Sequence, residues 1–175
     1  IAEHEDHPNG KIDRDEERIL HGALQYSDKR VVDVMTPQTV VKAVKAEQVI
    51  DDEFLQMASE SSHSRFPVYH EDLDDVTHML HIRDLLGNLG KKVSEVMEER
   101  AIKVNENMPL DTLLNRFIKR KQHLFMVIDD FAGISGVVSI EDVIEEILQV
   151  EIVDEDDVHE DLREFAKEQA TAKTS

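Results

Sequence analysis

The sequence predicts an α/β fold of the α+β kind, in which two β-α-β-β-α units pack sheet to sheet with pseudo-two-fold symmetry behind an N-terminal helix. The first observation is a repeat, because residues 31–35 return at 93–97, 62 positions later (93 minus 31). Residues 76–84 likewise return at 134–142, shifted by 58 (134 minus 76). The second observation is that both copies show the same order of apolar and turn segments. A period near 60 exceeds the roughly 20–50 residues of solenoid repeats, so two small units folded against each other are expected.

Composition narrows the class of protein. The chain has 175 residues, a formal net charge of −19 and no cysteine. The charge argues against a nucleic-acid partner, which requires clustered Lys and Arg, and against adhesion to anionic lipid. The missing cysteines exclude disulfides and thiolate metal sites and fit a reducing compartment. No apolar run approaches the roughly 18–20 residues that span a bilayer, so this piece of chain is expected to be soluble.

Four segments are expected. Residues 1–30 form a linker and the N-terminal helix, 31–90 the first repeat, 91–152 the second, and 153–175 an acidic tail that is partly disordered. The acidic ends are expected to be solvated segments; a patch that responds to cations is the alternative. The chain begins with Ile rather than Met, which favours a piece cut from a longer protein.

The helices are predicted from apolar spacing. Residues 13–26 read as a helix whose inward face is formed by Ile19, Leu20, Ala23 and Leu24. In the first repeat residues 51–59 form the next helix. In the second, Pro109 suits the first helical position. The residues at helical spacing after it, and those of the last helix, are Leu110, Leu113, Leu114, Phe117, Val143, Ile144, Ile147 and Leu148.

The strands follow from continuous apolar runs. Leu124–Ile128 is typical of a buried strand, and a turn then leads to a second strand at Ile134–Ser139. Residues 66–69 and 76–82 are the matching strands of the first repeat. Each unit therefore reads strand, helix, strand, strand, helix. Two half-exposed sheets of this kind can bury one another, and the cleft between them is the first place to look for a ligand.

Ser139 and Asp142 stand where the last strand runs into the last helix. A Ser with an acid three residues later is a helix capping box, which explains both residues without a ligand. The alternative is a nucleotide site, since a helix N-terminus attracts phosphate and a carboxylate can hold ribose hydroxyls. The residues alone leave both readings open.

Two further segments carry similar alternatives. Thr36 and Pro37 follow the Val-Met of the first repeat, where proline forces the preceding residue to be extended and exposes backbone groups. A turn without function explains them equally well. Ser64 and Arg65 precede the buried strand that contains Phe66. Arg65 suits a bidentate grip on phosphate, although a surface ion pair is the alternative in a chain this acidic.

Catalytic and metal patterns are not found in the sequence. The nine histidines show no HExxH or comparable spacing, so no metal site is expected. No GxGxxG, Walker, GxSxG or paired-carboxylate pattern occurs. An enzyme, for instance a nucleotide hydrolase, therefore has no support from a nucleophile or base.

The ordered motifs resemble one family. The residues that carry the resemblance are Val34-Met35-Thr36-Pro37, His63-Ser64-Arg65-Phe66-Pro67-Val68-Tyr69, Arg83-Asp84-Leu85-Leu86, the run from Gly136 to Ile147, and Glu151-Ile152-Val153-Asp154-Glu155. They are similar to the tandem cystathionine-β-synthase (CBS) domain pair, or Bateman module, of the CorC / cyclin-M group. These hemolysin-related membrane proteins are implicated in magnesium and cobalt efflux. The resemblance covers residues 16–157.

The resemblance implies a regulatory module that is not an enzyme and binds an adenine nucleotide, ATP with Mg²⁺ or AMP, between its repeats. It implies a nucleotide site made of Thr36, Pro37, Ser64, Arg65, Phe66, Pro67, Ser139 and Asp142. It further implies a homodimer through the CBS pair, and a parent whose membrane domain this module controls from the cytoplasmic face. A dimerisation module without any ligand remains the alternative function.

The chain departs from the family pattern at the pseudo-equivalent second site. That site would use His81 and Asp84, with the imidazole of His81 where the first site has a hydroxyl. An imidazole suits phosphate less well than a hydroxyl, so this second site is expected to be weak or empty.

Overall fold

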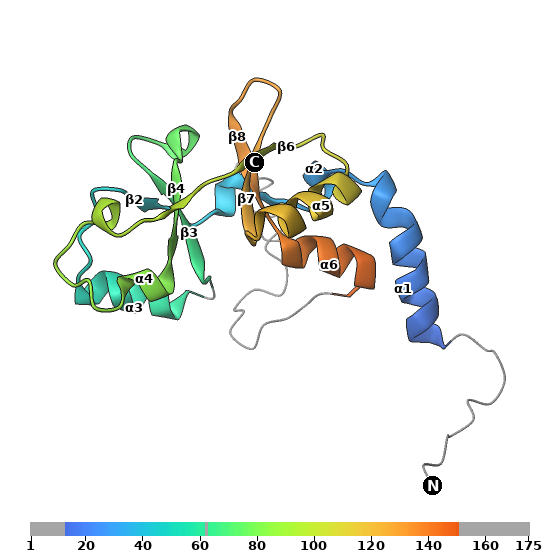
Figure 1. The fold of residues 1–175 in the computed structure, drawn as a ribbon, viewed down its shortest axis with the longest axis horizontal. Coiled ribbons are helices and arrows are strands. Elements are labelled where there is room, and N and C mark those ends of the chain that lie inside the picture. The colour runs from blue at the N-terminus through green and yellow to red at the C-terminus, as the bar shows by residue number, and fades with distance from the viewer. Residues whose placement is uncertain (1–12, 62, 151–175) are drawn as a thin grey trace, which may run out of the picture.

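The protein forms two four-stranded sheets flanked by helices, as the computed structural model shows (Figure 1). The structure describes residues 13–61 and 63–150. The helices are α1 (Arg14–Gln25), α2 (Val31–Val34), α3 (Asp52–Glu60), α4 (Ile82–Leu85), α5 (Leu110–Arg120) and α6 (Ile140–Leu148). The strands are β1 (Thr36–Pro37), β2 (Val44–Lys45), β3 (Arg65–Tyr69), β4 (His78–His81), β5 (Glu99–Arg100), β6 (Lys103–Asn105), β7 (Leu124–Ile128) and β8 (Ile134–Ser139). The predicted α+β fold class is confirmed.

The two sheets exchange their edge strands. Their orders are β1-β8-β7-β6 and β2-β3-β4-β5, so β1 of the first repeat joins the sheet of the second, and β5 returns the exchange. Thr36 pairs with Val137 on β8, and Glu99 pairs with Met79 on β4. Each repeat therefore completes the sheet of the other, which produces the expected pseudo-two-fold arrangement.

The sheets pack against each other through an apolar layer, as the sequence predicted. Met79 of one sheet and Met126 and Val137 of the other are buried in this layer, with exposures of 1%, 0% and 9%. Tyr69 and Leu124 pack against its edge. Residues at alternate positions of β3, β4, β7 and β8 thus face the space between the repeats.

The outer faces of the sheets are covered by helices. In the second half the rings of Phe117 on α5 and Phe125 on β7 stack in parallel, with centroids 4.1 Å apart. Val31 and Val34 lie in this same core, although they belong to the first repeat in sequence. Val93 correspondingly lies in the core of the first half. The predicted sequence units 31–90 and 91–152 therefore differ from the packing units. The first residues of each repeat pack in the core of the other half.

Several local predictions are refined by the structure. Pro109 is the residue before α5 rather than its first helical residue, because its backbone is extended (ψ 144). The strand predicted over residues 76–82 is shorter in the structure, where β4 spans His78–His81. The expected linker at 1–12 and the acidic tail at 153–175 lie outside the described residues.

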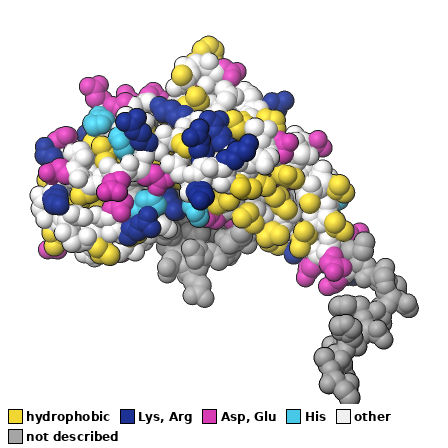
Figure 2. Space-filling model, in the orientation of Figure 1, with side chains coloured by type: hydrophobic (Ala, Val, Ile, Leu, Met, Phe, Trp, Pro, Cys, Tyr) yellow, Lys and Arg dark blue, Asp and Glu magenta, His cyan; other side chains and the backbone are white. Residues whose placement is uncertain are grey.

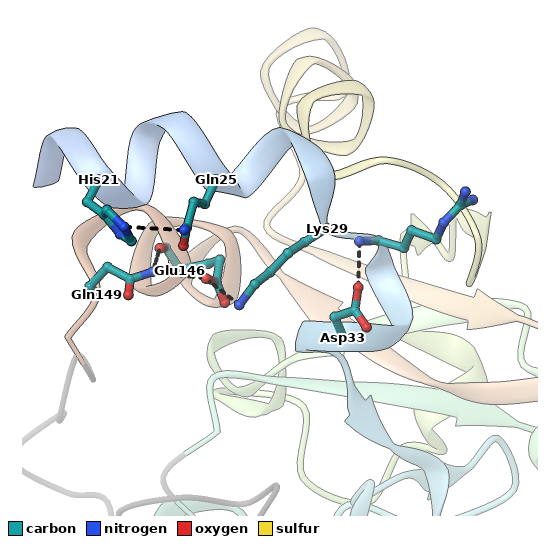
Figure 3. Close-up of polar contacts among 7 residues, drawn as sticks. His21, Gln25, Lys29, Asp33, Glu146 and Gln149 are labelled. Atoms are coloured by element: carbon teal, nitrogen blue, oxygen red, sulfur yellow. Dashed lines mark hydrogen bonds and ion pairs between the residues drawn. The ribbon is translucent and has the colours of Figure 1, made fainter. Parts of the chain in front are cut away.

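The prediction for the N-terminal helix was wrong in one respect. Its apolar residues Ile19, Leu20 and Leu24 are 38%, 51% and 77% exposed instead of facing inward. The helix contacts α6 through its other side, where Gly22 is buried. A Cβ on Gly22 would overlap the carbonyl oxygen of Ile147, so only glycine permits this close approach. The Lys29 Nζ atom, just beyond α1, adds an ion pair to the Glu146 Oε1 atom at 2.6 Å (Figure 3).

Gly136 on β8 allows β1 to join the second sheet. A Cβ at this position would overlap the carbonyl oxygen of Thr36. We expect Gly136→Ala to lower the free energy of unfolding by about 2 kcal/mol, because the backbone of β1 must move away. Urea denaturation measures the change. Gly133→Ala is the control, since the nearest atom there is a carboxylate oxygen of Asp129 at 3.2 Å, which can shift. Equal costs at both positions would contradict the prediction.

Candidate functional site

The exchange of β1 brings Thr36 beside the strand that leads to Ser139. Thr36 pairs directly with Val137, and Val137 belongs to the layer between the sheets. Because paired residues share a face of a sheet, Thr36 faces the space between the repeats, as does Ser139 two positions along β8. Pro37 pairs with Gly136 and lies in register on the opposite face. The structure therefore brings Thr36 and Ser139 to one side of one sheet.

Ser139 and Asp142 form the predicted capping box. The Asp142 backbone nitrogen donates to the Ser139 hydroxyl oxygen at 3.0 Å, and the Ser139 backbone nitrogen donates to the Asp142 carboxylate at 2.7 Å. These two bonds fix the first turn of α6 at the end of β8. Both side chains are half-buried. The capping box therefore holds an anion-attracting helix N-terminus at the end of β8.

The predicted residues of the first repeat lie on the facing sheet. Arg65 pairs with His81 and Pro67 pairs with Met79, so both face the space between the sheets. Ser64, just before β3, is exposed, and its carbonyl accepts a bond from the Ile82 nitrogen at 3.0 Å.

Phe66 on β3 points away from the space between the repeats. Its side chain is 1% exposed inside the core of the first half. Only its backbone is therefore placed to line a cleft.

Arg65 carries an orphaned polar atom. Its Nε atom is buried and has no hydrogen-bond partner in the structure. Buried donors in native proteins are almost always paired, and an unpaired one costs about 1–3 kcal/mol. A guanidinium donor that faces the space between the repeats is a feature that an anionic ligand would satisfy.

The residues predicted for the second site, His81 and Asp84, form hydrogen bonds within the protein. The His81 backbone nitrogen donates to the Asp84 carboxylate at 3.2 Å, which repeats the capping geometry of Ser139 and Asp142. The His81 side chain is also paired with Glu99 of β5. Sequence reasoning missed Glu99. The shift of 62 between the repeats aligns Glu99 with Pro37 in sequence (99 minus 62). Its contact with His81 becomes visible only in the structure.

His78 lies on the same strand, at the position that Gly136 holds in the second repeat. Burial lowers the pKa of its imidazole below the ordinary value, and the positive charges of Arg100 and His70 lower it further. His78 therefore favours the neutral form of its imidazole near pH 7, on the face of β4 opposite to His81.

A shallow hollow of about 440 Å³ lies beside α3. Its lining residues are Lys42, Glu53, Gln56, Met57, Glu60 and Ser61. Two carboxylates and one ammonium group make it a poor place for a phosphate chain.

Across residues 13–61 and 63–150 the structure shows no cluster of three or more His, Asp or Glu side chains arranged to hold a metal ion. In the same part of the chain no helix has the length and apolar character needed to cross a bilayer.

Comparison with known proteins identifies the fold unit. The family model for the CBS domain matches residues 93–149. The chain is also similar to the solved CBS domain of the bacterial CNNM/CorC family Mg²⁺ transporter in complex with an inhibitor, with 34% identity and a TM-score of 0.74. The match covers 82% of this chain and 90% of that one. The same transporter domain in complex with ATP matches with 33% identity, a TM-score of 0.71 and coverage of 77% and 98%.

Full-length relatives extend the comparison. The chain is 37% identical over 158 residues to the magnesium and cobalt efflux protein CorC of Escherichia coli K12, covering 88% of this chain and 53% of the relative. The CorC protein of Vibrio cholerae is 33% identical over 171 residues, with coverage of 94% and 58%. The chain thus spans little more than half the length of these relatives.

Two sheets that exchange edge strands, and two strands that each run into a helix with a matching capping box, define a tandem CBS-domain module. Within that class, the chain belongs to the CorC/CNNM family. The family resemblance seen in the sequence is confirmed.

The unpaired donor of Arg65 predicts that this residue costs stability. We expect Arg65→Met to raise the free energy of unfolding by about 1 kcal/mol, because it removes the buried unpaired atom and keeps an apolar stem. Urea denaturation measures the effect. The control is Arg83→Met, since 76% of the Arg83 side chain is exposed and little change is expected there. A marked loss of stability in Arg65→Met would show that the side chain supports the fold.

Proposed function

We propose that this chain is a regulatory module that binds an adenine nucleotide, ATP with Mg²⁺ or AMP, between its two repeats. The pairing of β1 with β8 carries the proposal, because it sets Thr36 on the same side of the sheet as Ser139. The facing sheet supplies Arg65 with its unpaired donor. Support also comes from similar structures, one in complex with ATP and a CBS pair from Klebsiella pneumoniae with bound AMP, the latter 28% identical with a TM-score of 0.57.

Each group has a role in this proposal. The backbone N–H groups at the N-terminus of α6 and the Ser139 hydroxyl donate hydrogen bonds to phosphate. The Asp142 carboxylate accepts hydrogen bonds from the ribose hydroxyls. Arg65 donates to phosphate from the opposite sheet. Thr36 and the backbone of Pro37 lie beside the base, while Ser64, Pro67 and the backbone of Phe66 line the wall.

Magnesium accompanies ATP in this proposal for an electrostatic reason. The chain has a net charge of −19, which repels an uncompensated triphosphate. The described residues hold no acidic cluster that would bind the ion on its own, so Mg²⁺ would arrive on the phosphates.

In this proposal the module acts on the membrane domain of its parent protein through α6 and α1. Ser139 and Asp142 stand at the start of α6, while Ile147 and Glu146 near its end contact Gly22 and Lys29. A nucleotide that shifts α6 therefore shifts α1 as well (Figure 3). The coupling equals the difference in nucleotide affinity between the two arrangements, typically about 1–3 kcal/mol. We propose that it controls a membrane domain involved in magnesium and cobalt efflux, from its cytoplasmic face.

Asp142→Asn tests the nucleotide site while keeping the helix cap, because the amide oxygen still accepts the Ser139 N–H. We expect the affinity for Mg-ATP and AMP to fall at least about tenfold, since the negative acceptor for the ribose hydroxyls is lost. Isothermal titration calorimetry measures the affinity. The control is Asp111→Asn, which removes the same charge from the first turn of α5.

Two outcomes would count against the proposal. No heat with any adenine nucleotide at millimolar concentration rejects nucleotide binding as such. Wild-type affinity in Asp142→Asn rejects the assignment of the site while leaving binding intact. GTP serves as the comparison for the base.

Dimerisation is the second function that an observation favours. The exposed face of α1 carries Ile19, Leu20 and Leu24, and Ile118 on α5 is 64% exposed. Figure 2 shows hydrophobic side chains gathered over the end of the molecule that holds α1, α5 and α6. A net charge of −19 on each copy opposes association, and an exposed apolar surface can offset that repulsion. We propose a homodimer of the CBS pair to which this face contributes; if no nucleotide binds, it is the module's function.

Leu20→Glu tests the dimer surface. The residue is half-exposed, so the fold tolerates the change, and we expect the dimer dissociation constant to rise at least about tenfold because a charge enters an apolar contact. Sedimentation velocity measures it. Val49→Glu is the control, because Val49 is similarly exposed at 43% but lies between β2 and α3. A monomeric wild type, or an equal effect of both changes, would contradict the proposal.

A further inference from the structure

The two edge strands enter their sheets one residue out of step. β1 begins at Thr36, two residues after Val34, whereas β5 begins at Glu99, three residues after Val96. Thr36 pairs with Val137, and Glu99 pairs with Met79. Val137 and Met79 are equivalent in the two repeats (137 minus 58 is 79) and both lie in the layer between the sheets. Glu99 therefore occupies the structural position of Thr36, although sequence alignment matches it with Pro37.

A slip of one residue changes which side chain faces the ligand side. Strand side chains alternate with a period of two, so the slip turns Glu99 toward the space between the repeats and Glu98 away from it. There Glu99 meets His81, which stands where the second repeat has Ser139 (139 minus 58 is 81). The side chains of His81 and Glu99 are only 10% and 23% exposed.

The first cleft is the proposed nucleotide site at Thr36, Ser139 and Asp142, and the second cleft is its counterpart at Glu99, His81 and Asp84. We propose that Glu99 and His81 fill the second cleft with an internal hydrogen-bonded pair, so that the module accepts one nucleotide per chain. This inference rests on the proposed function of the first cleft. At the first cleft the equivalent positions hold the small hydroxyl side chains of Thr36 and Ser139, which leave room for a ligand and can donate to phosphate. At the second cleft the same positions hold a carboxylate and an imidazole already bonded to each other.

The charges of the second cleft oppose a nucleotide as well. Asp84 is capped by the His81 backbone nitrogen just as Asp142 is capped by Ser139, so the carboxylate that distinguishes this site is Glu99. A phosphate would have to approach Glu99 and displace it from a mostly buried imidazole. Separating one partner of a buried pair is unfavourable because the other is left unpaired in a poorly solvated place. The pair thus excludes the ligand by its volume and by the negative charge of Glu99.

The double variant His81→Ser with Glu99→Thr tests the inference, because it copies the first cleft onto the second. Calorimetric titration with Mg-ATP and with AMP measures the number of nucleotides per chain. We expect the double variant to bind one nucleotide more than the wild type. Adding Asp84→Asn should weaken that second event at least about tenfold, and adding Asp142→Asn should weaken only the first.

The matched control is His81→Ser with Glu98→Thr, which removes a neighbouring carboxylate that the slip turns away; we expect no additional binding. A folded double variant that binds no more than the wild type overturns the inference, and so does a wild type that binds two. An equal gain in the control overturns it too. Circular dichroism checks the fold, and Glu99→Thr alone replaces the double variant if that variant unfolds.

Failure of the proposed function gives a different pattern. A wild type that binds no nucleotide rejects the first cleft as a site. The double variant then still decides about the second cleft. One nucleotide bound, with an affinity that falls when Asp84→Asn is added, supports the block by Glu99, whereas none bound overturns it.

Discussion

The hydrogen bonding of β1 to β8 is the interaction on which the rest of the structure depends. It carries a short segment of the first repeat into the sheet of the second, and β5 returns the exchange. Because the two halves are joined by shared sheets as well as by apolar packing, their relative position is set by backbone geometry. The close contact at Gly136 is the local condition for this arrangement, since any side chain there would push β1 out of register.

The exchange also makes both proposed clefts composite. Thr36 and Ser139 share a sheet although they stand in different repeats, and Arg65 belongs to the sheet opposite. A ligand between the sheets would touch three segments that are distant in sequence, and it would respond to any change in the angle between the halves. Regulation by a small molecule is a natural use of such a place, because binding and geometry are linked.

Much of this could be predicted from the sequence. The strands Leu124–Ile128 and Ile134–Ser139 were visible as apolar runs, and the capping box of Ser139 and Asp142 was visible from its spacing. The exchange of edge strands was not, because strands of two residues carry no periodic signal. The outward face of α1 was also missed. Its apolar stripe is real, but the contact with α6 is made by Gly22, and hydrophobicity patterns do not register a contact made by a residue without a side chain.

The contact between Gly22 and Ile147 has a mechanical consequence. Helices that meet through long side chains can absorb small displacements, because rotamers adjust before the backbones move. At Gly22 the main chain of one helix lies directly against a carbonyl of the other, and no flexible layer separates them. The joint is therefore stiff, and it would pass on even a sub-ångström tilt of α6 that a leucine at the same place would dissipate.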